Sequence, residues 1–346
     1  MVVVRPVRLE DLDQVRVLVQ GAGHGLTSLP KDDELLRRKV VESHESFQRP
    51  VDRPRGESYL LVLEDRDTGR LAGTSGIVSK VGGFEPFYAY RVETHVHQSE
   101  ALRVRKEIRC LHLVAEHSGP CEIGSLFLDA AYRRHGAGRL LSLSRFLLMA
   151  AAPHRFEREV IAEMRGVVDE AGRSPFWEAV GRHFFDIDYP KADYLSVKDK
   201  RFIAELLPTH PIYIPLLPPE AQAVIGQVHE QTRPALALLE QEGFRYLDMV
   251  DLFDAGPIVG CPRGEIRTVR ECRRARVAAV RDGPEPPGAP WLLAVWEPEF
   301  RACLGPAEVA GDEVVLTAEC AAALGAEPGQ AVLRVPARAP RGEEAR

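Results

Sequence analysis

Apolar residues follow two spacings along this chain, one typical of strands and one typical of helices. Residues 2–7 (VVVRPV) predict a short strand, and residues 10–20 predict a helix with its apolar side chains on one face. Two apolar runs on either side of residues 65–69 predict a β-hairpin within residues 58–80. Further strands are expected at residues 88–97, 107–116, 121–130 and 160–164, and further helices at residues 31–47, 138–149 and 174–183.

Beyond about residue 186 the pattern partly repeats. Strands are expected at residues 201–207, 212–217 and 244–253, and helices at residues 219–227 and 234–242. SPFWEAVGRHFF (174–185) and RPALALLEQEGFRY (233–246) each contain a helical stretch, a glycine and then a phenylalanine, which suggests an internal repeat. We therefore expect a core over residues 1–260, with the repeat after about residue 186, and a small C-terminal lobe over residues 261–346 that ends in a disordered polar tail.

The composition is that of a soluble globular protein. Of the 346 residues, 45% are hydrophobic and 28% are charged, and no stretch approaches the ~18 consecutive apolar residues of a membrane span. Charges at Arg5 and Arg8 come too early for a secretory signal, so a cytoplasmic enzyme is expected. A formal net charge of -6 argues against a nucleic-acid partner. The 6 cysteines form no CxxC pair, and we interpret them as free thiols.

The sequence RRHGAG (Arg133–Gly138) lies between a predicted buried strand and a long apolar helix. Glycines at such a turn let backbone N–H groups approach a phosphate, and the helix N-terminus adds about half a positive charge. This setting predicts a pyrophosphate site, whereas the string alone also fits an ordinary turn. A dinucleotide fingerprint needs a small residue where Leu141 stands, and the Gly-Lys-Ser/Thr of a P-loop does not occur.

An R-x-x-G-x-G/A string in this setting resembles the coenzyme A loop of GNAT-type acyltransferases. VRPVRLEDL (4–12) resembles their opening strand and helix, and ALALLEQEGFRY (235–246) resembles their late helix-Gly-Phe-strand signature. The resemblance implies an α+β fold in three layers, a GNAT-like mixed, splayed sheet flanked by helices, here with a smaller β-rich C-terminal lobe. It implies that acyl-CoA binds at Arg133, Arg134, Gly136, Ala137 and Gly138.

A narrower resemblance, to the arginine N-succinyltransferase family, is carried by six separated strings that occur in order between about residues 2 and 276. They are GLTSLP (25–30), SLFLDAAYR (125–133), IAEMRGVVDEAGRSPFWEAVGRHFF (161–185), FIAEL (202–206), QAVIGQVH (222–229) and FDAGP (253–257). Residues 277–346 resemble the family only loosely.

The narrower resemblance implies transfer of the succinyl group of succinyl-CoA to the α-amino group of L-arginine, giving N2-succinyl-L-arginine and CoA. This is the first step of an ammonia-producing catabolism of arginine to glutamate and succinate. Succinyl-CoA would be a co-substrate, with no permanently bound cofactor and no metal. The expected partners are these two small molecules, with no nucleic acid and no membrane. A homo-oligomer, or a hetero-oligomer with a related subunit, is also conceivable.

The chemistry needs a proton-transfer group for the amine and the departing thiolate, a cation for each carboxylate, and an acid for the guanidinium. By resemblance His229 matches the family's proton donor, and its ordinary pKa of about 6.5 suits the role. The alternative for His229 is a capping residue on the surface. Leu126 matches the family's succinyl-CoA contact, where a leucine contributes backbone and packing.

Glu163 and Arg165 are expected on one face of a strand. Glu163 would lie near the guanidinium of the substrate, and Arg165 would lie near a carboxylate. The alternative is a structural ion pair between the two side chains. Ser174 is a further candidate for substrate binding, and also a plausible helix N-cap. GLTSLP is a candidate loop for closing over arginine. His95 and His97 form an HxH pair without an evident third ligand, so we do not expect them to bind metal.

Two other functions stay open on the sequence alone. One is a GNAT-type enzyme with another donor or amine, such as acetyl-CoA or ornithine. The other is a catalytically silent module that binds CoA or an amino acid and regulates. The RRHGAG loop together with His229 favours an enzyme.

Overall fold

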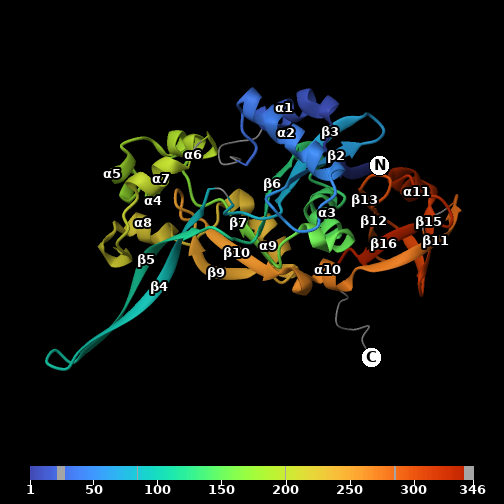
Figure 1. Ribbon diagram of the computed structural model, residues 1–346. Coiled ribbons are helices and arrows are strands. Elements are labelled where there is room, and N and C mark those ends of the chain that lie inside the picture. The colour runs from blue at the N-terminus through green and yellow to red at the C-terminus, as the bar shows by residue number, and fades with distance from the viewer. Residues whose placement is uncertain (22–27, 84, 199, 284–285, 339–346) are drawn as a thin grey trace. The chain divides into compact units, whose positions relative to one another are not determined.

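The computed structural model describes residues 1–21, 28–83, 85–198, 200–283 and 286–338, and the chain divides into two compact units (Figure 1). Unit 1 comprises Met1–Ser79, Gly124–Arg158 and Pro262–Arg346, and unit 2 comprises Lys80–Ile123 and Glu159–Cys261. This division differs from the expected core and separate C-terminal lobe, because the C-terminal strands pair with the first strand of the chain. Most of the expected disordered tail lies outside the described residues.

Unit 1 contains a mixed sheet. Its strands, in order across the sheet, are β14 (Ala307–Ala310), β15 (Glu313–Thr317), β11 (Arg273–Arg281), β16 (Ala331–Pro336), β12 (Trp291–Val295), β13 (Arg301–Gly305), β1 (Val2–Pro6), β2 (Ser58–Asp65) and β3 (Arg70–Val78). Strands β11 and β15 are parallel, whereas β1 is antiparallel to both neighbours and meets β13 at Val4 and Ala302. The predicted hairpin is β2–β3, whose turn closes with Gly69 N–H donating to Asp65 O at 2.7 Å.

The helices of unit 1 cover its sheet with apolar faces. They are α1 (Leu12–Gly21), α2 (Asp33–Gln48), α3 (Ala137–Ala151), α10 (Arg267–Glu271) and α11 (Ala318–Leu324), with 3-10 helices η1 (Leu9–Asp11), η2 (Ala130–Tyr132), η3 (Pro153–Arg155) and η6 (Arg263–Glu265). Asp32 caps α2 by accepting hydrogen bonds from the N–H groups of Glu34 and Leu35 at 3.1 Å. Val15 of α1 and Val40 of α2 pack against the sheet in one buried cluster.

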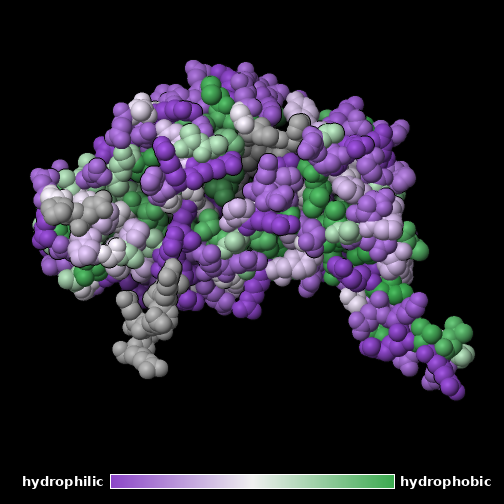
Figure 2. Space-filling view, turned by 180° about the vertical axis from the view of Figure 1, so that it is seen from behind, coloured by the Kyte–Doolittle hydropathy of each residue, from purple (hydrophilic) through white to green (hydrophobic). Residues whose placement is uncertain are grey.

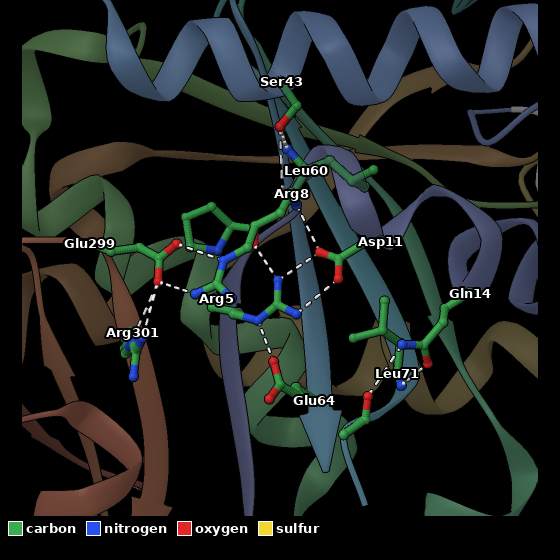
Figure 3. Close-up of polar contacts among 12 residues, drawn as sticks. Arg5, Arg8, Asp11, Gln14, Ser43, Leu60, Glu64, Leu71, Glu299 and Arg301 are labelled. Carbon is green, nitrogen blue, oxygen red and sulfur yellow. Dashed lines mark hydrogen bonds and ion pairs between the residues drawn. The ribbon is translucent and has the colours of Figure 1, made fainter. Parts of the chain in front are cut away.

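A buried network of ion pairs fixes the start of the chain within unit 1 (Figure 3). Arg5 is 6% exposed and donates to both carboxylate oxygens of Asp11, at 2.6 and 3.0 Å, and to Glu64. Arg8 donates to both oxygens of Glu299, at 3.3 and 2.9 Å. Removal of Asp11 would leave the buried charge of Arg5 without its main partner, at a cost of about 3–5 kcal/mol. The N-terminal strand and the C-terminal segment therefore depend on each other.

Unit 2 is built on strands β7 (Glu159–Glu163), β10 (Pro257–Pro262), β9 (Arg245–Val250), β4 (Phe87–Ser99), β5 (Val104–Glu116) and β8 (Ile212–Tyr213). Strand β6 (Cys121–Leu128) begins in unit 2, where it runs parallel to β7 through the pairs Cys121–Val160 and Glu122–Ile161, and its later residues belong to unit 1. The helices of unit 2 are α4 (Pro175–Ala179), α5 (Arg182–Phe185), α6 (Tyr189–Lys198), α7 (Arg201–Leu206), α8 (Pro219–Val224) and α9 (Arg233–Gln241), with 3-10 helices η4 (Ile214–Leu216) and η5 (Glu230–Thr232).

The expected fold class is confirmed as a mixed sheet flanked by helices, with a β-rich C-terminal region. Two strand predictions were wrong. Residues 201–206 are helical because Ile203 buries one side of a single helical turn, and the strand expected at residues 212–217 stops at Tyr213 because Pro215 lacks a ladder N–H. The internal repeat stays a prediction. Among the described residues, no helix is long and apolar enough to cross a membrane.

Candidate active site

The RRHGAG loop has the strand–turn–helix setting that the sequence predicts. It follows η2, and the backbone turns through two left-handed residues, His135 with φ 51° and Gly136 with φ 78°. Helix α3 then begins at Ala137, and its first helical bond runs from Leu140 N–H to Gly136 O at 2.9 Å. Glycine suits position 136 because it adopts this conformation without steric cost.

The same loop can hold an anion. The first N–H groups of an α-helix have no acceptor within the helix, and α3 is 15 residues long, so its N-terminus is electropositive. Arg133 and Arg134 are exposed beside it, and Arg133 Nε donates to Leu128 O at 3.2 Å. The start of α3 therefore combines backbone N–H groups with two exposed arginines just before it in the sequence, a combination that suits a diphosphate.

Strand β6 is distorted just before Leu126. Ser125 is buried and has φ 51°, which is rare for a residue with a side chain. Its N–H donates to Ser28 Oγ at 3.0 Å, and its hydroxyl donates to Ser28 O at 3.3 Å. A Cβ on Gly76 of β3 would lie 3.0 Å from Ser125 Cβ, so this close approach favours glycine. The half-buried Leu126 is thus presented by an irregular strand.

The distortion of β6 was not predicted, although the glycines of AGTSG in β3 are a sequence signal of close backbone approach. The GLTSLP loop was a candidate for closing over arginine. Gly25 to Thr27 lie outside the described residues, while Ser28 contacts β6 directly.

In unit 2, His229 has features of both roles considered for it, a helix cap and a proton-transfer group. Its Nδ1 accepts a hydrogen bond from Gln231 N–H at 3.2 Å, so the side chain caps η5. The ring is half-buried, and burial followed by the charge of Arg165 lowers the pKa of His229, with Glu230 opposing. With Nδ1 accepting, the neutral ring carries its proton on Nε2. The Nε2–H group can therefore donate a hydrogen bond to a ligand, and the ring takes up a further proton only at Nδ1, in place of the bond from Gln231.

The FDAGP loop positions His229 and Arg165. The Asp254 carboxylate is 5% exposed and accepts from Gly166 N–H at 2.7 Å and from Gly256 N–H at 2.8 Å. His229 N–H donates to Arg165 O at 2.9 Å, next to this anchored glycine. Burial, and then repulsion from nearby carboxylates, raises the pKa of Asp254 well above its ordinary value. Asp254 was not among the predicted site residues; its signal was the D-x-G turn within FDAGP.

Arg165 has unused hydrogen-bonding capacity. Its Nε is buried and has no hydrogen-bond partner among the residues that the structure describes. Strand β7 ends at Glu163, so Arg165 lies beyond the strand, and no ion pair joins the two side chains within the described part of the chain. The ion-pair alternative is therefore not observed. An unpaired guanidinium N–H is well suited to a carboxylate ligand.

Glu163 is an acidic group in an acidic neighbourhood. Surrounding protein atoms raise the pKa of Glu163 well above its ordinary value by desolvation, and the charges of Glu122 and Asp251 add to the rise. The side chain nevertheless keeps an exposed surface. Such a carboxyl gains from a cation that arrives from solvent, because the cation offsets the repulsion.

Ser174 acts as the predicted helix cap. It is fully buried, and its hydroxyl accepts from Trp177 N–H at 3.2 Å at the start of α4, where Pro175 follows at the first position. This hydroxyl is already engaged in the fold, so the geometry favours a structural role over contact with substrate.

Comparisons with known proteins identify the family. Residues 2–268 match the family "Arginine N-succinyltransferase beta subunit", and residues 273–336 match the C-terminal domain of that subunit. The chain belongs to the arginine N-succinyltransferase family. The second match extends the family to the C-terminal residues that resembled it only loosely.

Individual members of the family are similar over nearly the whole chain. Arginine N-succinyltransferase of Enterobacter sp. (strain 638) is 46% identical over 323 residues, or 92% of each chain. That of Escherichia coli (strain 55989 / EAEC) is 43% identical over 337 residues, or 96% of each chain. The solved structure of arginine/ornithine succinyltransferase subunit AI from Pseudomonas aeruginosa has a TM-score of 0.88 and 38% identity, covering 98% of this chain and 99% of that one.

Proposed function

We propose that the chain is an arginine N-succinyltransferase, which transfers the succinyl group of succinyl-CoA to the α-amino group of L-arginine and releases N2-succinyl-L-arginine and CoA. The observation that carries this proposal is the similarity, over nearly the full length, to proteins named for this activity. The candidate residues support it because they include groups suited to each part of the reaction.

The donor is assigned to the RRHGAG loop. The diphosphate of CoA accepts hydrogen bonds from the N–H groups at the start of α3 and pairs with Arg133 and Arg134. The distorted stretch of β6 that carries Leu126 is assigned to the acyl-pantetheine arm, which Leu126 contacts by packing. The donor arrives with each turnover, so the proposal needs no permanently bound cofactor.

The acceptor is assigned to Arg165 and Glu163. The guanidinium of Arg165, whose Nε–H has no partner among the described residues, is assigned to a carboxylate of one substrate. Glu163 pairs with the guanidinium of arginine, which lowers the raised pKa of Glu163 and favours its charged form. The neighbouring carboxylates make this part of unit 2 selective for a cationic side chain.

His229 is assigned to proton transfer. The α-amine nitrogen forms a bond to the thioester carbon, the C–S bond breaks, and the departing thiolate takes a proton. The lowered pKa of His229 makes its protonated ring a readier proton donor than an ordinary histidine. At neutral pH most of the ring is deprotonated, and it can receive the proton that the incoming ammonium loses at Nδ1, in place of the hydrogen bond from Gln231, because Nε2 already carries a proton.

The test is to incubate purified protein with succinyl-CoA and L-arginine and to follow both free thiol and the mass of the product. Arginine-dependent thiol release with the mass of succinylarginine is expected. Thiol release no higher than in the control without arginine would overturn the proposal. Binding of CoA without release would identify a silent module instead. Parallel assays with ornithine and with acetyl-CoA rank the acceptor and the donor, since the Pseudomonas relative is named for both amino acids.

The protein is also proposed to assemble with a second copy or with a related subunit, because the similar Pseudomonas structure is named as a subunit. Light scattering after size exclusion tests this against the 38.4 kDa of one chain. A monomer at all concentrations would remove the homo-oligomer from consideration.

A further inference from the structure

A long antiparallel hairpin in unit 2 carries a cluster of side chains that the proposed reaction does not use. Strands β4 and β5 pair along their whole length, from Phe87–Glu116 to Ser99–Val104, and the hairpin extends beyond the other strands of its unit (Figure 1). Exposed hydrophobic residues such as Leu102 lie at its tip, which appears in green in the view from behind (Figure 2). The side chains of Glu93, His95 and His112 lie nearer the base.

These three side chains converge on one point. In the register His112 of β5 lies opposite Arg91, so Glu93 lies between His112 and His95 along the hairpin. The Nε2 atoms of His95 and His112 are 3.4 Å apart. Glu93 Oε2 is 3.4 Å from His112 Nε2 and 3.8 Å from His95 Nε2.

These separations suit a metal ion better than they suit direct hydrogen bonds. A hydrogen bond from an imidazole N–H to a nitrogen or oxygen acceptor is typically about 2.9–3.0 Å long. The contacts between the two rings at 3.4 Å and between Glu93 and His95 at 3.8 Å are therefore weak hydrogen bonds at best. Two ligand atoms bound to a tetrahedral zinc ion at about 2.0–2.1 Å lie about 3.4 Å from each other. An ion can therefore occupy the centre of the triangle of Glu93, His95 and His112 with little movement of the side chains.

We propose that Glu93, His95 and His112 bind a divalent transition-metal ion, with Zn²⁺ as the best fit. Two imidazoles and one carboxylate are the ligands of many three-residue zinc sites, in which the fourth position is left for water or another group. All three side chains are half-buried or exposed, so an ion has direct access from solvent. The HxH pair of the sequence contributes only His95, and its missing partners are Glu93 and His112 rather than His97.

Metal binding is expected to stiffen the hairpin. The three ligands come from both strands, so an ion would cross-link β4 and β5 in addition to the backbone hydrogen bonds of the exposed hairpin. An ion that binds only the native hairpin stabilises it by RT ln(1 + c/Kd), where c is the free ion concentration, so the stabilisation grows with the logarithm of that concentration. A hard cation such as Mg²⁺ is not expected to bind, because it takes oxygen ligands and parts reluctantly with water.

The test is a titration of the full chain with Zn²⁺ in competition with a chromophoric chelator, in a reducing buffer free of other chelators. We expect one site per chain that is lost or weakened by about 10-fold or more in His95→Ala and in His112→Ala. His97→Ala is the matched control, because His97 lies on the same strand and face but outside the cluster, and it should bind like the wild type.

A second readout separates the hairpin from other histidines and thiols. Hydrogen exchange of residues 91–98 and 106–113 should slow on addition of Zn²⁺ in the wild type and in His97→Ala, and stay unchanged in His95→Ala. Failure of the wild type to bind Zn²⁺ would overturn the proposal. So would affinity that is equal in all variants, or an equal loss in His97→Ala, since either result places the ion elsewhere.

Discussion

Valine in place of Gly138 should weaken the binding of CoA while leaving the fold intact. Gly138 is the second residue of α3, and a Cβ at this position meets only Leu128 Cδ2, at an ordinary contact distance of 3.5 Å. The protein itself therefore has room for a Cβ here. A loss of affinity at an unchanged thermal midpoint would then come from the ligand, because the branched side chain crowds the N–H groups of the first helical turn.

The expected magnitude follows from the hydrogen bonds at stake. A hydrogen bond to a charged group contributes about 1.5–3 kcal/mol, and 1.4 kcal/mol corresponds to a tenfold change in Kd. Loss of one such bond to the diphosphate predicts a Kd for CoA that is about 10- to 100-fold higher in Gly138→Val. Calorimetric titration with CoA measures this change, and the thermal midpoint of unfolding reports on the fold.

Gly138→Ala is the matched control. A single methyl reaches less far than the valine side chain, and the related loops accept glycine or alanine at this position. Alanine inside a helix also stabilises it over glycine by about 0.4–1 kcal/mol, so the thermal midpoint should rise slightly. Unchanged CoA affinity in Gly138→Val, at an unchanged thermal midpoint, would show that this loop does not hold the diphosphate.

Gly136 is a poorer choice for the same test. Its φ of 78° costs a residue with a side chain about 1–2 kcal/mol, and its Cβ would lie 2.5 Å from Leu304 Cδ2. Gly136→Val is therefore expected to disturb the local fold as well as the ligand. Weaker CoA binding in that variant would not distinguish the two causes.

Three further predictions concern unit 2. His229→Ala should lower turnover by about 100-fold or more with CoA affinity within about twofold of the wild type, and unchanged turnover would make His229 a bystander. The charge of Arg165 lowers the pKa of His229, so Arg165→Gln should raise the apparent pKa that His229 contributes to the pH dependence of kcat/KM, toward the ordinary 6.5. An apparent pKa that stays in place would contradict this coupling. Asp254→Asn leaves one of two buried N–H groups without its acceptor. We expect the free energy of unfolding, measured by urea titration, to fall by about 1–3 kcal/mol, and turnover to fall with it. Full activity at lowered stability would show that the loop does not position the site.

Local features of the candidate site could be predicted from the sequence. The strand–turn–helix around Arg133–Gly138 depends on adjacent residues, and so does the cap at Ser174. Features that depend on strand register could not be predicted. The position of His112 beside His95 is set by the pairing of a 13-residue strand with another 13-residue strand, and no local pattern fixes that register.

The same limit applies to the domain division. The pairing of Val4 with Ala302, and the ion pairs of Arg8 with Glu299, join segments from opposite ends of the chain. Periodicity along the sequence says nothing about which strands become neighbours, so a C-terminal lobe was the natural expectation. Residues 201–206 were assigned to a strand for a related reason, since a short apolar run without flanking signals fits a helix equally well.

IAEMRG, the beginning of the string over residues 161–185, and FDAGP pack against each other and form one structural unit. Asp254 accepts the N–H of Gly166, and a Cβ on Gly166 would lie 2.4 Å from Asp254 O. A Cβ on Gly256 would lie 2.0 Å from Met164 O, so neither glycine tolerates a side chain although neither has a positive φ. Agreement of these strings with a family is thus evidence for one shared geometry rather than two independent matches. Because His229 N–H bonds to the residue before Gly166, that geometry is also what fixes the proposed proton-transfer group.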